Sequence, residues 1–153
     1  MEQDVSKVSH PTIVSLKEEF KKNPRPDGLF SIDAGSLLDF YKKYYLFLRP
    51  IVNLTDKEID VMSSFMKQRW QLSREIPGLD SSKLDILVMS DKVKSEVIKD
   101  ANLSKKHFYV VMSALKKKGI IKNNIIEPKL IPNVSIDNRG IFKLMLVFKG
   151  NWQ

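Results

Sequence analysis

Apolar residues first recur with clear helical spacing after residue 54. Thr55, with Glu58 three residues later, has the pattern of a capping box, in which each side chain bonds the other residue's backbone amide. A helix that begins there is predicted to run to about Ser73. Its apolar face consists of Ile59, Met62, Phe65, Met66 and Trp70.

Two further helices are predicted beyond residue 90, separated by a short turn at Asn102 and Leu103. Ser90 or Asp91 caps the first, which runs to about Ala101. Ser104 caps the second, because its hydroxyl can accept a hydrogen bond from a free amide of the first turn. Gly119 ends it, since glycine adopts the left-handed conformation without penalty. The apolar positions of the second helix lie at i, i+4 and i+7, which is one helical face: Phe108, Met112 and Leu115.

Three stretches have the apolar pattern of strands. Leu84–Met89 is short, aliphatic and partly alternating, and is predicted to be a first strand. Ile120–Ile131 and Ile141–Lys149 are predicted to form a pair joined by a loop over residues 132–140. Pro128 lacks an amide hydrogen, so it places the second of these three strands at an edge or a bulge.

The first 53 residues form a separate part of the pattern. Residues 1–10 are an arm, and residues 11–20 form a short helix before a break rich in proline. A helix is predicted from Ser36 to about Leu48, although Tyr44–Leu48 fits a strand equally well. This stretch is apolar on every side. It either wraps the core of the domain or presents an interface to another chain.

The sequence Leu103–Phe108, followed by Leu115–Ile121, resembles the recognition helix and wing entry of winged helix-turn-helix domains. The resemblance extends over about residues 54–149. It implies an α+β fold that is a mainly helical winged helix-turn-helix with a small antiparallel sheet, over residues 54–153. Residues 1–53 would be an N-terminal helical extension.

Composition restricts the class of protein. The 153 residues suit one domain with an appendage or two very small ones, and 42% hydrophobic residues are enough for a core. There is no cysteine, which removes disulfides and thiolate metal sites. No apolar run approaches the roughly 20 residues that span a bilayer, and residues 1–10 lack a signal-peptide core. We therefore expect no membrane partner and a cytoplasmic location, in a bacterium or an infected host cell.

The net charge of +8 is unevenly distributed. Residues 1–50 carry +1, residues 51–90 carry −1, and residues 91–153 carry +8 from 13 basic and 5 acidic side chains. The whole excess therefore lies in the predicted helix-turn-helix and wing. Such a concentration favours a polyanionic partner.

Motifs of catalysis are missing from the sequence. Its only histidines are His10 and His107, its six glycines do not form a phosphate-binding loop, and no residues have zinc-ligand spacing. We expect a protein without enzymatic activity, metal, cofactor or small-molecule substrate.

The main functional hypothesis is that the chain binds double-stranded DNA, as a regulator or a DNA-associated factor of a phage. The helix that follows Ser104 would enter the major groove, and lysines would contact phosphates. This helix contains no arginine, the usual reader of guanine. The candidate DNA-binding residues are Lys105, Lys106, His107, Tyr109, Ser113, Lys116, Lys117, Lys122 and Arg139.

The alternative is a structural component of a phage virion, such as a neck, connector or ring protein. The compact, lysine-rich sequences of residues 54–66 and 116–124 resemble those of small winged-helix proteins of tailed phages. Some of those proteins use the fold as a packing module. The partners would then be other protein chains or copies of this one, and the location would be the virion. The candidate interface residues are Tyr41, Tyr44, Tyr45, Phe47 and Trp152.

Overall fold

The computed structural model describes residues 32–132 and 149–151. Within them it is mainly helical, with five α-helices and a small antiparallel sheet, so it has the expected α+β composition. The elements follow in the order α3 (Leu37–Val52), α4 (Asp56–Glu75), α5 (Ser81–Val88), α6 (Asp91–Asp100), α7 (Lys105–Lys117), β1 (Ile121–Lys122), β2 (Ile125–Ile126) and the 3₁₀-helix η1 (Pro128–Leu130). The predicted helix at 11–20 and the strand and loop predicted beyond residue 132 lie outside the described residues, apart from residues 149–151.

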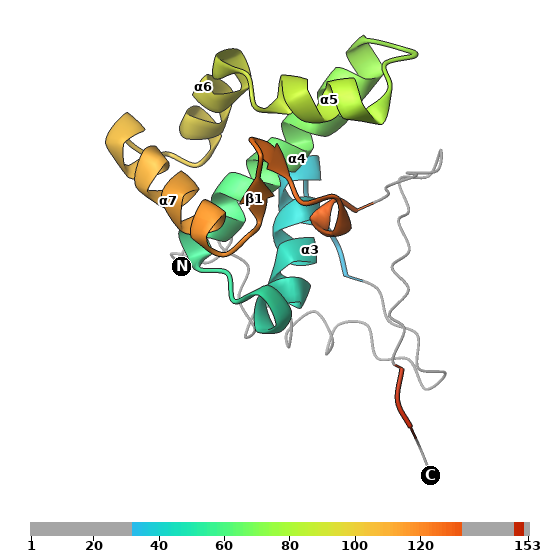
Figure 1. The fold of residues 1–153 in the computed structure, drawn as a ribbon, viewed down its shortest axis with the longest axis vertical. Coiled ribbons are helices and arrows are strands. Elements are labelled where there is room, and N and C mark those ends of the chain that lie inside the picture. The colour runs from blue at the N-terminus through green and yellow to red at the C-terminus, as the bar shows by residue number, and fades with distance from the viewer. Residues whose placement is uncertain (1–31, 133–148, 152–153) are drawn as a thin grey trace, which may run out of the picture.

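Helix α4 is the centre of the fold, and α3, α5, α6 and α7 all pack against it (Figure 1). Every residue from Glu58 to Met66 is buried, as expected for a helix with neighbours on all sides. The predicted capping box is present: Glu58 N donates to Thr55 Oγ1 at 3.2 Å, and Thr55 N donates to Glu58 Oε2 at 2.9 Å. The N-terminus of this central helix is therefore fixed by its own sequence.

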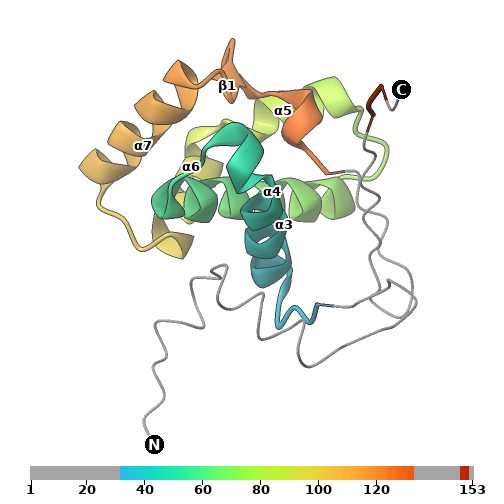
Figure 2. The same ribbon diagram turned by 90° about the horizontal axis from the view of Figure 1, so that it is seen from below.

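Helix α3 crosses α4 (Figure 2) and contributes to the same hydrophobic core. Ser36 caps it, and it continues to Val52, four residues beyond the predicted end. The alternative of a strand over Tyr44–Leu48 is wrong. Tyr45 is completely buried, and its hydroxyl donates to the backbone carbonyl of Leu130 at 2.9 Å. This stretch therefore covers the core of its own chain.

The prediction of a strand over Leu84–Met89 is wrong, because these residues belong mostly to helix α5. Asp80 caps this helix and accepts a hydrogen bond from Lys83 N at 2.9 Å. Leu84 and Val88 are buried one turn apart, while Ile86 between them is 65% exposed. The stretch that alternates like a strand therefore forms a helix, whose buried face has the spacing i, i+4.

Helices α6 and α7 match the predicted helices, with Ser90 and Ser104 as their N-caps. The predicted strand over Ile120–Ile131 is wrong as one continuous element. It is instead a tight hairpin, in which Ile121 pairs with Ile126 and Lys122 with Ile125, followed by η1. Asn123 and Asn124 form its tip with positive φ, as a two-residue turn of type I′ requires.

Candidate nucleic-acid interface

Helix α7 has one buried and one exposed face. Ser104 Oγ accepts a hydrogen bond from His107 N at 3.1 Å and so satisfies an amide of the first turn. Gly119, with φ of +74°, follows the end of the helix. The inward side chains pack into the common core, and the ring centroids of Phe108 and Phe65 are 6.3 Å apart. The buried set is Phe108, Val111, Met112 and Leu115.

The outward face of α7 is basic at both ends and neutral in the middle. The stripe Lys106, Val110, Ser113 and Lys117 has the spacing i, i+4, i+7 and i+11, so these residues lie almost in line along the helix. At 1.5 Å per residue, about 16 Å separate the first and the last of them along the axis. Of the sequence-predicted DNA-binding residues, eight are described, and all eight are exposed: Lys105, Lys106, His107, Tyr109, Ser113, Lys116, Lys117 and Lys122.

The segment that forms this surface carries no acidic residue. Between Asp100 and Glu127 the chain contains six lysines and no aspartate or glutamate. Among residues 32–132, the ion pairs include none to the four lysines of α7 or to Lys122. Within this part of the chain, the positive charge of these five lysines is therefore available for contact with a partner.

Lys118 differs from the two lysines before it, because its side chain turns toward the start of α4. Its Nζ lies 2.6 Å from Glu58 Oε2 and 2.5 Å from the carbonyl oxygen of Asn53. This contact holds the C-terminal end of α7 against the loop between α3 and α4. Three consecutive lysines give no sign of which one turns inward, so the sequence alone does not predict this contact.

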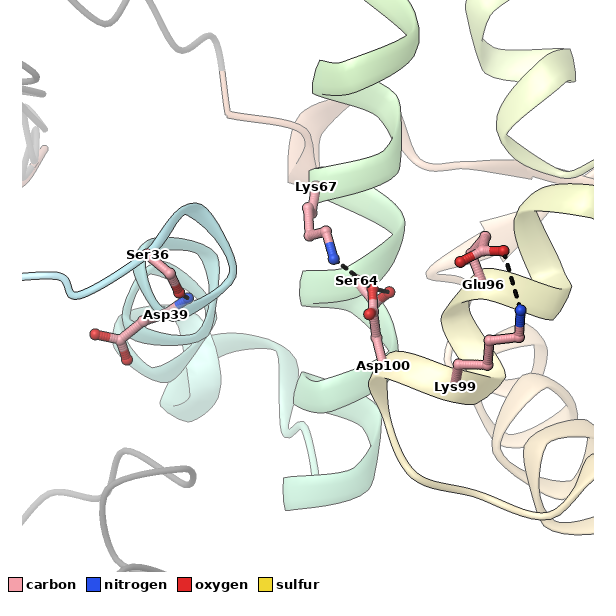
Figure 3. Close-up of polar contacts among 7 residues, drawn as sticks. All are labelled: Ser36, Asp39, Ser64, Lys67, Glu96, Lys99 and Asp100. Carbon is pink, nitrogen blue, oxygen red and sulfur yellow. Dashed lines mark hydrogen bonds and ion pairs between the residues drawn. The ribbon is translucent and has the colours of Figure 1, made fainter.

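The turn before α7 is fixed on α4 by a second polar contact, at the end of α6. Asp100 Oδ2 accepts hydrogen bonds from Ser64 Oγ at 2.7 Å and Lys67 Nζ at 2.9 Å (Figure 3). Desolvation of the Asp100 carboxyl acts to raise its pKa, but these hydrogen bonds outweigh it and lower the pKa below its usual value. The charged Asp100 carboxylate thus holds the end of α6, and the turn that leads to α7, against the central helix α4.

The hairpin lies directly after α7 and carries a further lysine. Lys122, in β1, is exposed, and the two asparagines at the tip are exposed beside it. Ile120 and Ile121 are buried, and the amide of Glu127 donates to the carbonyl of Ile120 at 2.8 Å, which closes the hairpin onto the core. Short as it is, the hairpin presents Lys122 from a fixed position.

The four described candidates for a protein interface differ in exposure. Tyr41 and Tyr45 lie in the core of their own chain, so the expectation that they meet a partner must be corrected: Tyr41 is only 3% exposed and Tyr45 is completely buried. Tyr44 and Phe47 are half-buried on α3. Trp152, like Arg139 of the DNA-binding set, lies outside the described residues.

The described residues also include a pocket lined by charged side chains. They contain no group of three or more histidine or acidic side chains able to hold a metal ion. An open pocket of about 400 Å³ has Arg69, Trp70 and Asp85 in its lining, but Arg69 Nη2 lies 2.9 Å from Asp85 Oδ1, so the two charges neutralise each other. None of the described helices has the length and apolar character needed to cross a membrane.

Comparison with family models, with curated proteins and with solved structures finds no match for this chain. The functional interpretation therefore depends on the geometry and charge of α7 and the hairpin.

Proposed function

We propose that the chain is a non-enzymatic DNA-binding protein of the winged-helix kind, with α7 in the major groove. The observation that carries this proposal is the outward face of α7, where exposed lysines at both ends flank a neutral centre and the helix itself contains no acidic residue. Lys122 on the adjoining hairpin is a further exposed cation.

The dimensions of the face suit a duplex. The major groove of B-DNA is about 12 Å wide, with a row of phosphates along each edge. About 16 Å of helix separate Lys106 from Lys117, so their flexible side chains can reach the two phosphate rows while the centre of the helix faces the bases. Phosphate contacts of this kind supply most of the affinity of non-specific binding.

The two polar anchors support the same function. The end of α7 is fixed to the central helix by the contact of Lys118 with Glu58. The end of α6 is fixed to it at a separate point, by the contacts of Asp100 with Ser64 and Lys67. A binding helix held in this way loses little conformational freedom when it meets its partner, and that lowers the entropic cost of binding.

The experiment is fluorescence anisotropy with a labelled random duplex at about 50 and 200 mM salt. Three to five phosphate contacts predict a loss of affinity of about 40- to 500-fold between these salt concentrations. Absence of binding at about 50 mM salt would overturn the proposal, as would an affinity that does not change with salt.

A second candidate function is a packing module in a protein assembly, such as a phage neck, connector or ring. The observation that favours it is the exposure of two neighbouring apolar side chains on α5, Ile86 at 65% and Leu87 at 36%. Self-assembly through this helix predicts a concentration-dependent oligomer in sedimentation velocity, which Ile86→Glu reduces to monomer. A monomer at all concentrations would overturn self-assembly through α5.

A further inference from the structure

Two apolar side chains are exposed in the middle of the otherwise polar face of α7. Tyr109 is 43% exposed and Val110 is 59% exposed. The core does not require either of them, because the inward face of α7 is already complete. Valine is also a poorer helix former than the lysines around it. These two positions therefore call for a functional explanation.

The position of Val110 in the stripe is specific. It lies one turn after Lys106 and two turns before Lys117, on the line that joins them. If those lysines contact the phosphates along the two edges of a groove, Val110 lies over the groove floor between them. Tyr109 lies beside the stripe, and its ring packs edge to face on that of Phe108 at 5.2 Å, so Val110 is the apolar member of the stripe itself.

The chemistry of the groove floor then limits what Val110 can contact. Hydrogen-bond donors and acceptors occupy the major-groove edges of guanine, cytosine and adenine, whereas thymine adds a C5-methyl group. An isopropyl group offers no hydrogen bond, so placing it against a polar edge removes water without replacement. Against a methyl group it buries apolar surface instead, which is favourable.

We infer that Val110 reads the C5-methyl group of thymine, so the preferred partner is an A·T-rich duplex. This inference rests on the proposed function. Ser113, the next residue of the stripe, can bond any base edge and adds little discrimination. No arginine, asparagine or glutamine of α7 competes with Val110 as a base reader.

The experiment compares two alternating duplexes, one of adenine and thymine and one in which uracil replaces every thymine. The two have the same hydrogen-bonding groups and differ only in the methyl, and alternation removes any dependence on register. We expect the full-length protein to bind the thymine duplex more tightly, by about fourfold for each methyl group buried. Equal affinities for the two duplexes would overturn the inference while leaving the proposed function intact.

Two variants locate the effect. Val110→Ala, at an exposed position, is expected to bring the ratio of affinities close to one while the salt dependence stays that of the wild type. Ile51→Ala removes an exposed aliphatic side chain from α3 and should preserve the ratio. If Val110→Ala kept the wild-type ratio of affinities for the two duplexes, the preference for thymine would come from the stiffness of the duplex, and the inference would be overturned. Failure of all forms to bind either duplex at about 50 mM salt would overturn the proposed function along with it.

Discussion

Glu58 Oε2 accepts hydrogen bonds from both Lys118 Nζ, at 2.6 Å, and the backbone amide of Thr55, at 2.9 Å. One carboxylate oxygen thus closes the N-terminal cap of α4 and holds the C-terminal end of α7. The side chain of Glu58 is only 4% exposed, so its charge has little access to water. The orientation of α7 therefore depends on a contact remote from its binding face.

Lys118→Met tests this contact. The variant leaves the Glu58 carboxylate without its counter-charge, and we expect the free energy of unfolding to fall by about 2 kcal/mol. This is less than the loss for a fully buried pair, because the Lys118 side chain is 27% exposed. Urea unfolding monitored by circular dichroism gives the value. Lys117→Met, at the exposed neighbour, is the matched control, and an equal loss in both variants would contradict the role of the contact.

The lysines of the outward face are expected to act on binding without affecting stability. Lys106→Gln and Lys117→Gln should each reduce the slope of log affinity against log salt by about 1, because each removes one phosphate contact. Lys99→Gln, at an exposed lysine of α6, should leave the slope unchanged. Anisotropy titrations at several salt concentrations supply the slopes. If Lys106→Gln and Lys117→Gln kept the slope of the wild type, as Lys99→Gln should, α7 would be excluded from the contact with DNA.

Burial of two tyrosines predicts a loss of stability in alkali. Desolvation raises the pKa of Tyr41 to about 12, despite the opposing charge of Arg69, and raises that of Tyr45 well above its usual value. In the unfolded chain both titrate near pH 10. Above that pH the unfolded state releases protons that the folded state retains, so the free energy of unfolding falls as pH rises.

The double variant Tyr41→Phe, Tyr45→Phe should show a shallower fall between about pH 10 and 12. It should begin from a lower stability at neutral pH, by about 1 kcal/mol, because the Tyr45 hydroxyl no longer donates to Leu130. Urea unfolding over this pH range measures both effects. Parallel pH profiles for the variant and the wild type would show that neither tyrosine causes the alkaline loss.

The hairpin tip makes a different prediction. Asn124 has φ of +59°, a region that glycine and asparagine tolerate and β-branched residues avoid. Asn124→Val should destabilise the protein by about 1–2 kcal/mol, whereas Asn124→Gly should leave the stability nearly unchanged. Thermal unfolding distinguishes the two. If the Asn124→Val protein proves as stable as the Asn124→Gly protein, the left-handed conformation of the tip is not required.

Local signals were sufficient to predict much of this fold. Thr55, Ser90 and Ser104 each mark the start of a helix through a side-chain bond to the backbone, and all three bonds are present. The outward positions of α7 also follow from its periodicity, because the spacing of its apolar residues leaves only one face for the core. Caps and periodicity are local properties, so the sequence displays them directly.

The errors occurred where local patterns were ambiguous or where distant residues decide. Leu84–Met89 alternates like a strand, and only Asp80 before it indicates a helix. Asn123-Asn124 between two aliphatic pairs was the overlooked signal of the hairpin. The inward turn of Lys118 and the burial of Tyr45 depend on partners 60 and 85 residues away along the chain. No local pattern can reveal such partners.

The bond between the Tyr45 hydroxyl and the Leu130 carbonyl has a consequence for the order of events during translation. At roughly 5–20 residues per second, the ribosome takes about 4–17 s to synthesise the 85 residues between them. During that interval α3 emerges with its aromatic side chains and without the segment that covers Tyr45. The nascent chain must therefore keep this surface from association, by provisional packing on α4 or by a chaperone, until Leu130 leaves the exit tunnel.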